Sequence, residues 1–131
     1  MKVDKSFTWH RVDPQALNLK GLKVAIIGGT GGIGRGLDRF MASRGAKVLV
    51  VGQTFRDSDI SAIEFIKADL SPMREAKLVG ELLPAETLDL ILFTTGILAA
   101  PKRHETPEGI ERDMAVSYLS RMVIIREIGR A

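Results

Sequence analysis

One stretch near the amino terminus decides the fold of this chain. It reads Lys23-Val24-Ala25-Ile26-Ile27-Gly28-Gly29-Thr30-Gly31-Gly32-Ile33-Gly34-Arg35-Gly36. The apolar run 24–27 is short and rich in β-branched residues, which is typical of a strand buried on both faces of a parallel sheet. The glycines that follow allow a sharp turn into a helix, which we expect to begin near Ile33 and to stop at Gly45.

A strand, a glycine-rich turn and a helix N-terminus together form a binding site for a phosphate. Unpaired backbone N–H groups and the positive end of the helix dipole point at one place. Because glycine has no β-carbon, a diphosphate can approach the backbone closely. We therefore expect the diphosphate of a dinucleotide over residues 28–34. The alternative is a purely structural turn, and it is less favoured because a second buried-type strand, 47–51, follows the helix.

Size and composition bound the remaining choices. The chain has 131 residues, enough for one domain with a core, and it has no cysteine, which excludes disulfides and thiolate metal sites. Its net charge of +3 comes from 19 basic and 16 acidic residues that alternate along the chain, so we expect no nucleic-acid partner. Neither a membrane span nor a signal peptide is recognisable, and we expect a cytoplasmic protein. His10 and His104 lack further ligands at metal spacing, so no metal is expected.

The rest of the chain alternates strands and helices. Residues 1–20 are predicted to form an N-terminal extension, with 6–10 as an edge strand or an arm, and 21–131 a partial NAD(P)-binding Rossmann domain. Strands are expected at 64–70 and 88–93, and Ser71-Pro72 is expected to cap a helix that runs to about residue 83. The predicted fold class is α/β, a Rossmann-like doubly wound parallel sheet of which only the first half is present, with strand order 3-2-1-4.

A long apolar helix is predicted at the carboxyl end. Thr106, Pro107 and Glu108 are typical of a helix start, with a capping hydroxyl, proline at the first position and an acid in the first turn. The expected helix spans 108–128 and is either deeply buried or in contact with a second surface. Core packing is the expected role of Tyr118. One apolar face is marked by Ile110, Met114, Tyr118, Met122 and Ile125.

The end of the second strand predicts which nicotinamide cofactor fits. An acid at this place would bind both ribose hydroxyls and repel a 2′-phosphate, but the chain has Gly52 and Gln53 here. Thr54 and Arg56 follow and are suited to charge-assisted bonds with an extra phosphate. We expect NADP, with NAD also possible. The alternative, Arg56 as an ordinary loop charge, stays open.

Several motifs in register resemble the amino-terminal half of the short-chain dehydrogenase/reductase family, in its classical branch. Gly28, Gly32 and Gly34 match the family's G-x-x-x-G-x-G turn, although Gly28, Gly31 and Gly34 also fit the spacing of the extended and atypical branches. Gly96 and the long helix favour the classical branch. The resemblance implies that the dinucleotide contacts the turn, the ribose-binding segment, an acidic pair at the adenine and a wall under the nicotinamide ribose. The residues so implied are Gly28, Thr30, Gly31, Gly32, Ile33, Gly34, Gln53, Thr54, Arg56, Asp69, Leu70, Thr95 and Gly96.

The catalytic element of this family is not found in the chain. Ser117 takes the place of an Asn that helps to hold a water in the proton relay, and the alternative is a helix residue bonded to its own backbone. The family's Tyr-x-x-x-Lys is absent, because the single tyrosine, Tyr118, is followed four residues later by Met122. The chain alone is therefore expected to be inactive, as the cofactor-binding half of a longer enzyme or as a natural short protein.

Three readings of the function follow. The favoured one is an NADP-dependent oxidoreductase that transfers hydride to or from a small carbonyl or alcohol substrate. The second is a sensor or regulatory module that binds NAD(P) without chemistry. Two departures from the family pattern would suit it: Ser117 in place of Asn, and Thr94-Thr95-Gly96 where the family has Asn-Asn-Ala-Gly. The third is a structural piece whose apolar helix mediates dimerisation. A homo-oligomer is expected, since pairing would cover that helix.

Overall fold

The structure is a computed structural model that describes residues 6, 10–98 and 100–130. Its centre is a four-stranded parallel sheet made of β1 (Lys23–Ile27), β2 (Lys47–Gly52), β3 (Ile63–Lys67) and β4 (Leu90–Phe93). The strand order is β3-β2-β1-β4, which confirms the predicted doubly wound arrangement. Residues 7–9 of the predicted arm lie outside the described residues.

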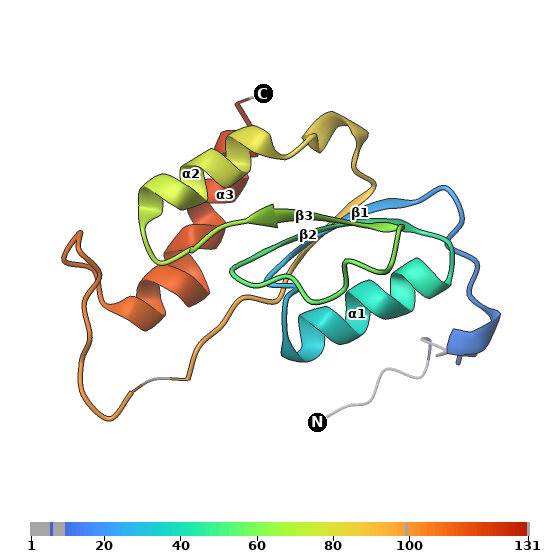
Figure 1. Ribbon diagram of the computed structural model, residues 1–131, viewed down its shortest axis with the longest axis horizontal. Coiled ribbons are helices and arrows are strands. Elements are labelled where there is room, and N and C mark those ends of the chain that lie inside the picture. Colours follow the sequence, from blue (N-terminus) through green and yellow to red (C-terminus); the bar gives the residue numbers. More distant parts are fainter. Residues whose placement is uncertain (1–5, 7–9, 99, 131) are drawn as a thin grey trace.

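Helices cover both faces of the sheet (Figure 1). Helix α1 (Gly32–Ser43) lies on one face, and α2 (Met73–Leu82) and α3 (Ser120–Ile128) lie side by side on the other. Each face has its own core, because alternate residues of β1 point to opposite sides. Val24 and Ile26 pack with Leu37 and Met41 of α1. On the other face the core combines Ala25, Ile27, Ala76, Val79 and Ile124.

Helix α1 has the predicted bounds. Gly31 is its N-cap, and Gly45, at φ +96°, follows its last turn. Part of the predicted extension contacts this end of the helix: Leu19 N–H donates to Arg44 C=O at 2.9 Å, and the Arg44 side chain donates to Gln15 C=O. The extension is therefore anchored to the domain from about residue 15.

Two element boundaries differ from the prediction. β3 ends at Lys67 instead of running to residue 70, and β4 begins at Leu90, after a 3₁₀ turn at Ala85–Thr87. Ser71 does not cap α2. Pro72 is the N-cap, and the Ser71 hydroxyl donates to Asp69 at 2.8 Å instead. The competing hydrogen bond to a nearby carboxylate decides the role of this serine.

The start of the long helix was predicted wrongly. Thr106 accepts from Gly109 N–H, and Gly109, at φ +75°, turns the chain back so that Glu105 and Glu111 form an antiparallel bridge. The helix begins only after Glu111, whose carboxylate accepts from the Asp113 and Met114 amides and so replaces the expected threonine cap. Arg112 and Asp113 are α-helical, and Met114–Leu119, which follow, are π-helical and run directly into α3.

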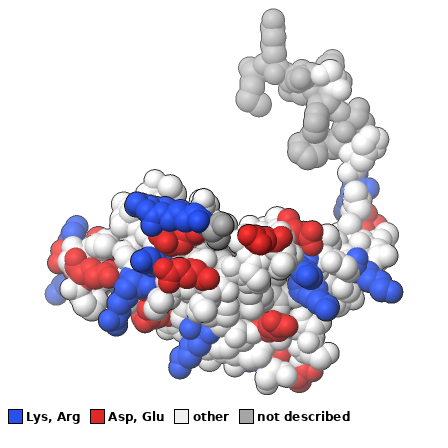
Figure 2. Space-filling model, turned by 90° about the horizontal axis from the view of Figure 1, so that it is seen from above, with Lys and Arg blue, Asp and Glu red and all other residues white. Residues whose placement is uncertain are grey.

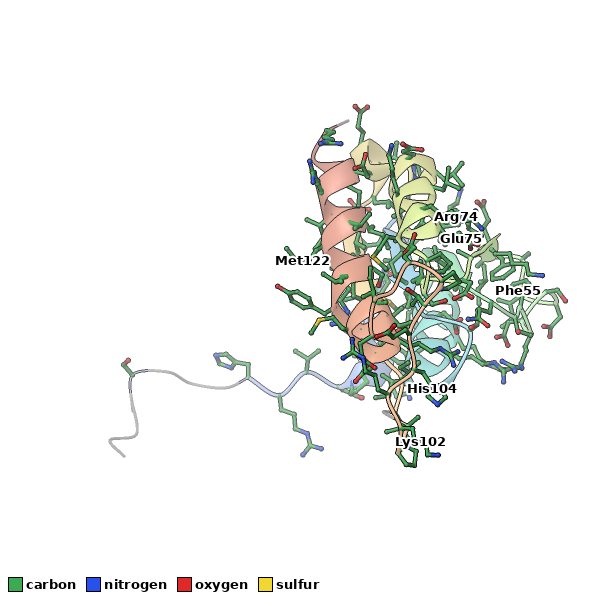
Figure 3. The ribbon with its side chains drawn as sticks, turned by 90° about the vertical axis from the view of Figure 1, so that its left-hand side faces the viewer. Phe55, Arg74, Glu75, Lys102, His104 and Met122 are labelled. Carbon is green, nitrogen blue, oxygen red and sulfur yellow. The ribbon has the colours of Figure 1, made fainter. Side chains whose placement is uncertain are left out.

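The apolar face predicted for this helix does not face the core. Met114, Tyr118, Met122 and Ile125 are about half exposed, so core packing for Tyr118 is wrong. The side packed against the rest of the molecule carries Ala115, Ser120 and Ile124 instead. Figure 3 shows Met122 on the side of α3 that faces away from α2. The exposed row thus fits the other predicted possibility, a second surface.

The charges and the helices give two further observations. Basic and acidic side chains are intermingled over the face shown in Figure 2, in agreement with the alternation in the sequence. Within the described ranges, every helix is too short or too polar to cross a lipid bilayer.

Candidate functional site

A cleft of about 540 Å³ opens where β1, β2 and β4 end. Because the strands are parallel, their carboxyl ends share one edge of the sheet, and the loops that follow them meet there. The volume lies in the range of small-molecule sites. Twelve of the thirteen residues predicted to contact a cofactor line this cleft: Gly28, Thr30, Gly31, Gly32, Ile33, Gln53, Thr54, Arg56, Asp69, Leu70, Thr95 and Gly96.

The remaining residue, Gly34, lies beneath the cleft and holds the turn together. A β-carbon on Gly34 would lie 2.5 Å from the Gly28 carbonyl oxygen and would also meet the Thr94 hydroxyl. A β-carbon on Gly28, at φ +96°, would lie 2.7 Å from the Thr95 nitrogen. These separations are shorter than any real contact, so the glycines allow the turn, α1 and the 94–95 segment to pack backbone against backbone.

The N-terminus of α1 presents to the cleft backbone amides that have no hydrogen-bond acceptor among the described residues. The first intrahelical bond runs from Arg35 N–H to Gly31 C=O at 3.1 Å, so the amides of Gly32, Ile33 and Gly34 precede it. The Ile33 side chain lines the cleft and is 80% exposed. This arrangement of amides, helix dipole and missing β-carbons is suited to an anion such as a diphosphate.

The segment after β2 forms one wall. A β-carbon on Gly52 would lie 2.6 Å from the Thr30 hydroxyl oxygen, so glycine leaves room for Thr30. The Arg56 guanidinium donates to Thr30 C=O at 2.7 Å, and Gln53 donates to Asp69 at 3.3 Å. The arginine side chain thus bridges this segment and the glycine-rich turn, and brings a positive charge to the rim of the cleft.

Asp69 and Leu70, which follow β3, line the cleft beside this segment. The Asp69 Oδ1 atom accepts from the Ser71 amide at 2.9 Å and from its hydroxyl, and the Asp69 amide donates to Glu75 at 2.8 Å. These bonds fix the loop and direct the carboxylate. Its Oδ2 atom accepts no bond from the part of the chain that the structure describes, which leaves it available to a ligand.

The other end of the cleft lies between β4 and the π-helical segment. Thr95 is buried, and its hydroxyl and carbonyl oxygens accept from the Arg121 guanidinium. The Ser117 hydroxyl donates to the Asp113 carboxylate and accepts from the Ile97 amide at 3.4 Å. Ser117 therefore lies beside the 95–97 backbone, and it does not make the back-bond to its own helix that was the alternative. Ser120 makes that bond, to Val116 C=O.

A cluster around a buried carboxylate behind the 53–56 wall was not predicted from the sequence. Asp57 is 3% exposed, and its carboxylate accepts two bonds from Arg35, both at 2.8 Å, and one from Arg39 at 3.1 Å. The hydrogen bond from Arg35 lowers the pKa of Asp57, so the carboxylate stays ionised at neutral pH. Arg35 and Arg39 are four residues apart on one helix face, which was the available signal. Their partner in the following loop was not identifiable by spacing.

A second buried acid in α1 has the opposite character. Asp38 is 1% exposed, and neither of its carboxylate oxygens has a hydrogen-bond partner among the described residues. Loss of hydration is the largest effect and raises its pKa to about 6; the nearby Arg39 backbone amide lowers this pKa, the charge of Asp57 raises it, and the charges of Arg35 and Arg39 lower it. Asp38 is costly to the fold when it is ionised.

The sequence comparisons relate the chain to oxidoreductases. It is 47% identical over 132 aligned residues to an uncharacterized oxidoreductase of Saccharomyces cerevisiae, covering 98% of this chain and 43% of that protein. It is 28% identical to the oxidoreductase calI of Penicillium decumbens, over 91% of this chain and 38% of the relative. The chain thus spans less than half the length of these relatives. No protein-family model matches it.

Solved structures of short-chain dehydrogenase/reductase proteins share its fold. One such family protein matches with a TM-score of 0.69 at 23% identity, over 87% of this chain and 51% of its own length. A short-chain dehydrogenase family protein from Francisella tularensis matches with a TM-score of 0.69 at 21% identity, over 83% and 46%. The predicted resemblance is confirmed: this chain has the fold of about half of such a protein, and its sequence relatives are oxidoreductases.

Proposed function

We propose that this chain, which has the fold of about half of a short-chain dehydrogenase/reductase protein, is the cofactor-binding part of an NADP-dependent oxidoreductase. The observation that carries the proposal is the cleft of about 540 Å³ at the carboxyl edge of the sheet. It combines the free amides of α1, the cationic 53–56 segment and the 94–96 segment. The complete protein would interconvert a small carbonyl compound and an alcohol.

The residues around the cleft fit a dinucleotide. The amides of Gly32, Ile33 and Gly34 would bind the diphosphate, since a β-carbon on Gly31 or Gly32 meets no atom within 4 Å and the space above them is open. Asp69 Oδ2 and the Leu70 backbone amide would bind the adenine. Arg56, with Thr54, would bind the 2′-phosphate of NADP, through guanidinium N–H groups that its bond to Thr30 leaves free.

The β4 end of the cleft would hold the nicotinamide ribose. When bound, the nicotinamide supplies the hydride that is exchanged with the substrate carbon. Thr95 and Gly96 would form the wall below it, held in place by Arg121 and by the Ser117 bond to Ile97. Ser117 would act as a positioning residue, because its hydroxyl donates its one hydrogen bond to the Asp113 carboxylate.

The proton for the substrate oxygen would come from residues outside these 131. The chain contains no Tyr-x-x-x-Lys, and Tyr118 lies half exposed on the outer face of its helix. We therefore expect dinucleotide binding but no turnover from this chain alone.

A second candidate is an NAD(P)-binding sensor without chemistry. The Ser117 hydroxyl favours it, since this hydroxyl donates its one hydrogen bond to the Asp113 carboxylate and therefore cannot donate to a relay water. The coding sequence downstream separates the two: a Tyr-x-x-x-Lys element some thirty to forty residues on supports the enzyme, and a stop codon supports the sensor.

Calorimetry with NADP and NAD tests the proposal. We expect Gly31→Val to lower the affinity for both dinucleotides by at least about tenfold, because the valine side chain would enter the open space over the amides. The extended backbone conformation of residue 31 tolerates any residue, so the variant should still fold. Gly36→Ala, on the exposed side of α1, is the matched control and should bind as the wild type does. Wild-type protein that binds neither dinucleotide would refute the proposal.

The choice of cofactor has its own variant. Arg56→Gln should lower the affinity for NADP by roughly ten- to a hundredfold and leave the affinity for NAD within about threefold of wild type, because only NADP carries the 2′-phosphate. Equal losses for both dinucleotides would show that Arg56 only holds the turn through Thr30.

A further inference from the structure

The 53–56 segment, which would select the cofactor, is held to α1 by hydrogen bonds behind the wall of the cleft. Residues 53–56 form the wall of the cleft, and Asp57 follows directly, with its side chain directed to Arg35 and Arg39 in the first two turns of α1. Arg35 binds both carboxylate oxygens, in the bidentate geometry that holds a guanidinium and a carboxylate most rigidly. The wall is therefore attached to the same helix whose N-terminus faces the cleft.

A second bond fastens the same segment from the front. Arg56 donates to Thr30 C=O, in the glycine-rich turn that immediately precedes α1. Asp57 and Arg56 thus connect one short segment to α1 and to the turn, on opposite sides of the wall. Because Arg56 precedes Asp57 by one residue, the position of the Asp57 carboxylate limits where the Arg56 side chain can lie.

We propose that Asp57 is the positioning residue for the 2′-phosphate of NADP: its bonds to Arg35 and Arg39 hold the 53–57 segment so that Arg56 lies at the rim of the cleft. This inference rests on the proposed NADP binding. It assigns selectivity to a buried carboxylate that does not touch the cofactor, and it makes Arg56 the phosphate ligand in place of its two basic neighbours.

The charges around Asp57 support this assignment. Arg35 and Arg39 carry two positive charges, and Asp57 neutralises one. The hydrogen bond and the charge of Asp57 raise the pKa of Arg35, and the charges of Asp38 and Asp59 raise it further. Asp57 is the one of these acids that is both buried and hydrogen-bonded to the arginines. Removal of its charge would release the 53–57 segment and both arginines together.

The experiment is calorimetry of NADP and NAD with Asp57→Asn, with Asp59→Asn as the matched control. Asp59 is an exposed acid in the same loop, and its variant should leave both affinities unchanged. For Asp57→Asn we expect a loss of NADP affinity of roughly tenfold, with NAD affinity within about threefold of wild type. Circular dichroism on the same samples verifies that the variant is folded.

Each outcome decides the proposal. Equal losses for NADP and NAD would make Asp57 a structural residue, and a gain in NADP affinity would mean that the released arginines bind the phosphate; both results overturn the proposal, as does an unchanged ratio. If Asp57→Asn does not fold, Arg39→Gln removes one of the three bonds, and it must reduce the NADP to NAD affinity ratio by about twofold or the proposal fails. Wild-type protein that binds neither dinucleotide refutes the proposed function itself, which separates the two failures.

Discussion

The two sides of β1 differ. On the β2 side, here called the closed side, neighbouring segments are joined by close contacts and hydrogen bonds. On the β4 side, here called the open side, a row of apolar residues is exposed. The strand residues 24–27 are fully buried, and the turn, α1 and the 53–57 segment are joined by glycine contacts and by the bonds of Arg56 and Asp57. Leu90 of β4 and the row Met114, Tyr118, Met122 and Ile125 are instead 41–55% exposed. The β2 side of the cleft is thus formed by segments of this chain that bond to one another, and the β4 side presents an exposed apolar surface.

The largest effect is expected where the closed side is tightest. Gly34→Val should lower the free energy of unfolding by roughly 3 kcal/mol or more, because its β-carbon would collide with the Gly28 backbone. Dinucleotide binding should be lost with it. Urea denaturation measures the change, and Gly36→Ala, two residues along the same helix, should be neutral or stabilising by up to about 1 kcal/mol.

Two neighbouring isoleucines test the contrast within one helix. Ile124 is 0% exposed in the core against α2, whereas Ile125 is 50% exposed. Ile124→Ala should cost roughly 2–4 kcal/mol in thermal or urea unfolding, and Ile125→Ala less than about 0.5 kcal/mol. A large effect of Ile125→Ala that grows with protein concentration would show that the exposed row is buried between copies of the chain.

Asp38 lies on the closed side but destabilises the fold, so its removal should stabilise the protein. Its pKa is about 6 in the folded state against an ordinary 3.8, so the folded state holds its proton more tightly and stability falls as the pH rises between these values. Asp38→Ala should raise the free energy of unfolding by roughly 1–2 kcal/mol at pH 8 and by much less at pH 4. Urea unfolding at both pH values measures this, and an equal gain at each would contradict the assigned pKa.

The smallest effect is expected at Ser117, on the open side. Ser117→Ala removes one bond to a half-buried carboxylate and a long one to Ile97, and should cost about 1 kcal/mol or less. Ser117→Thr keeps the hydroxyl and serves as the comparison. A loss above about 2 kcal/mol for the alanine variant would place Ser117 among the residues that hold the fold.

Sequence alone was sufficient where the signals are local. The β-branched run, the glycines and the amphipathic helix are contiguous, so the strand-turn-helix unit around residues 23–43 and its cleft were predictable. The same holds for the strand order, which follows from alternating elements and right-handed crossovers.

The errors come from contacts between segments. Thr106 and Pro107 have the pattern of a helix start, but Gly109 turns the chain first and Glu111 caps the helix. The Asp57 cluster joins residues 18 and 22 positions apart, which no local pattern shows. Apolar spacing identified the row that contains Tyr118, but periodicity cannot tell which of two apolar faces is packed against α2.

The π-helical stretch at Met114–Leu119 has a consequence for how this protein can vary. In an α-helix each residue advances the side-chain direction by about 100°, so a one-residue insertion or deletion rotates everything on one side of it relative to the other. Loss of a residue here would convert the stretch to regular α-helix and leave the chain nearly as long. It would turn Ser117 and Asp113 about the axis relative to Ile124. In aligned relatives, a single gap within this stretch would therefore mark a change in how Ser117 contacts the Ile97 backbone beside the cleft, although neither residue had been replaced.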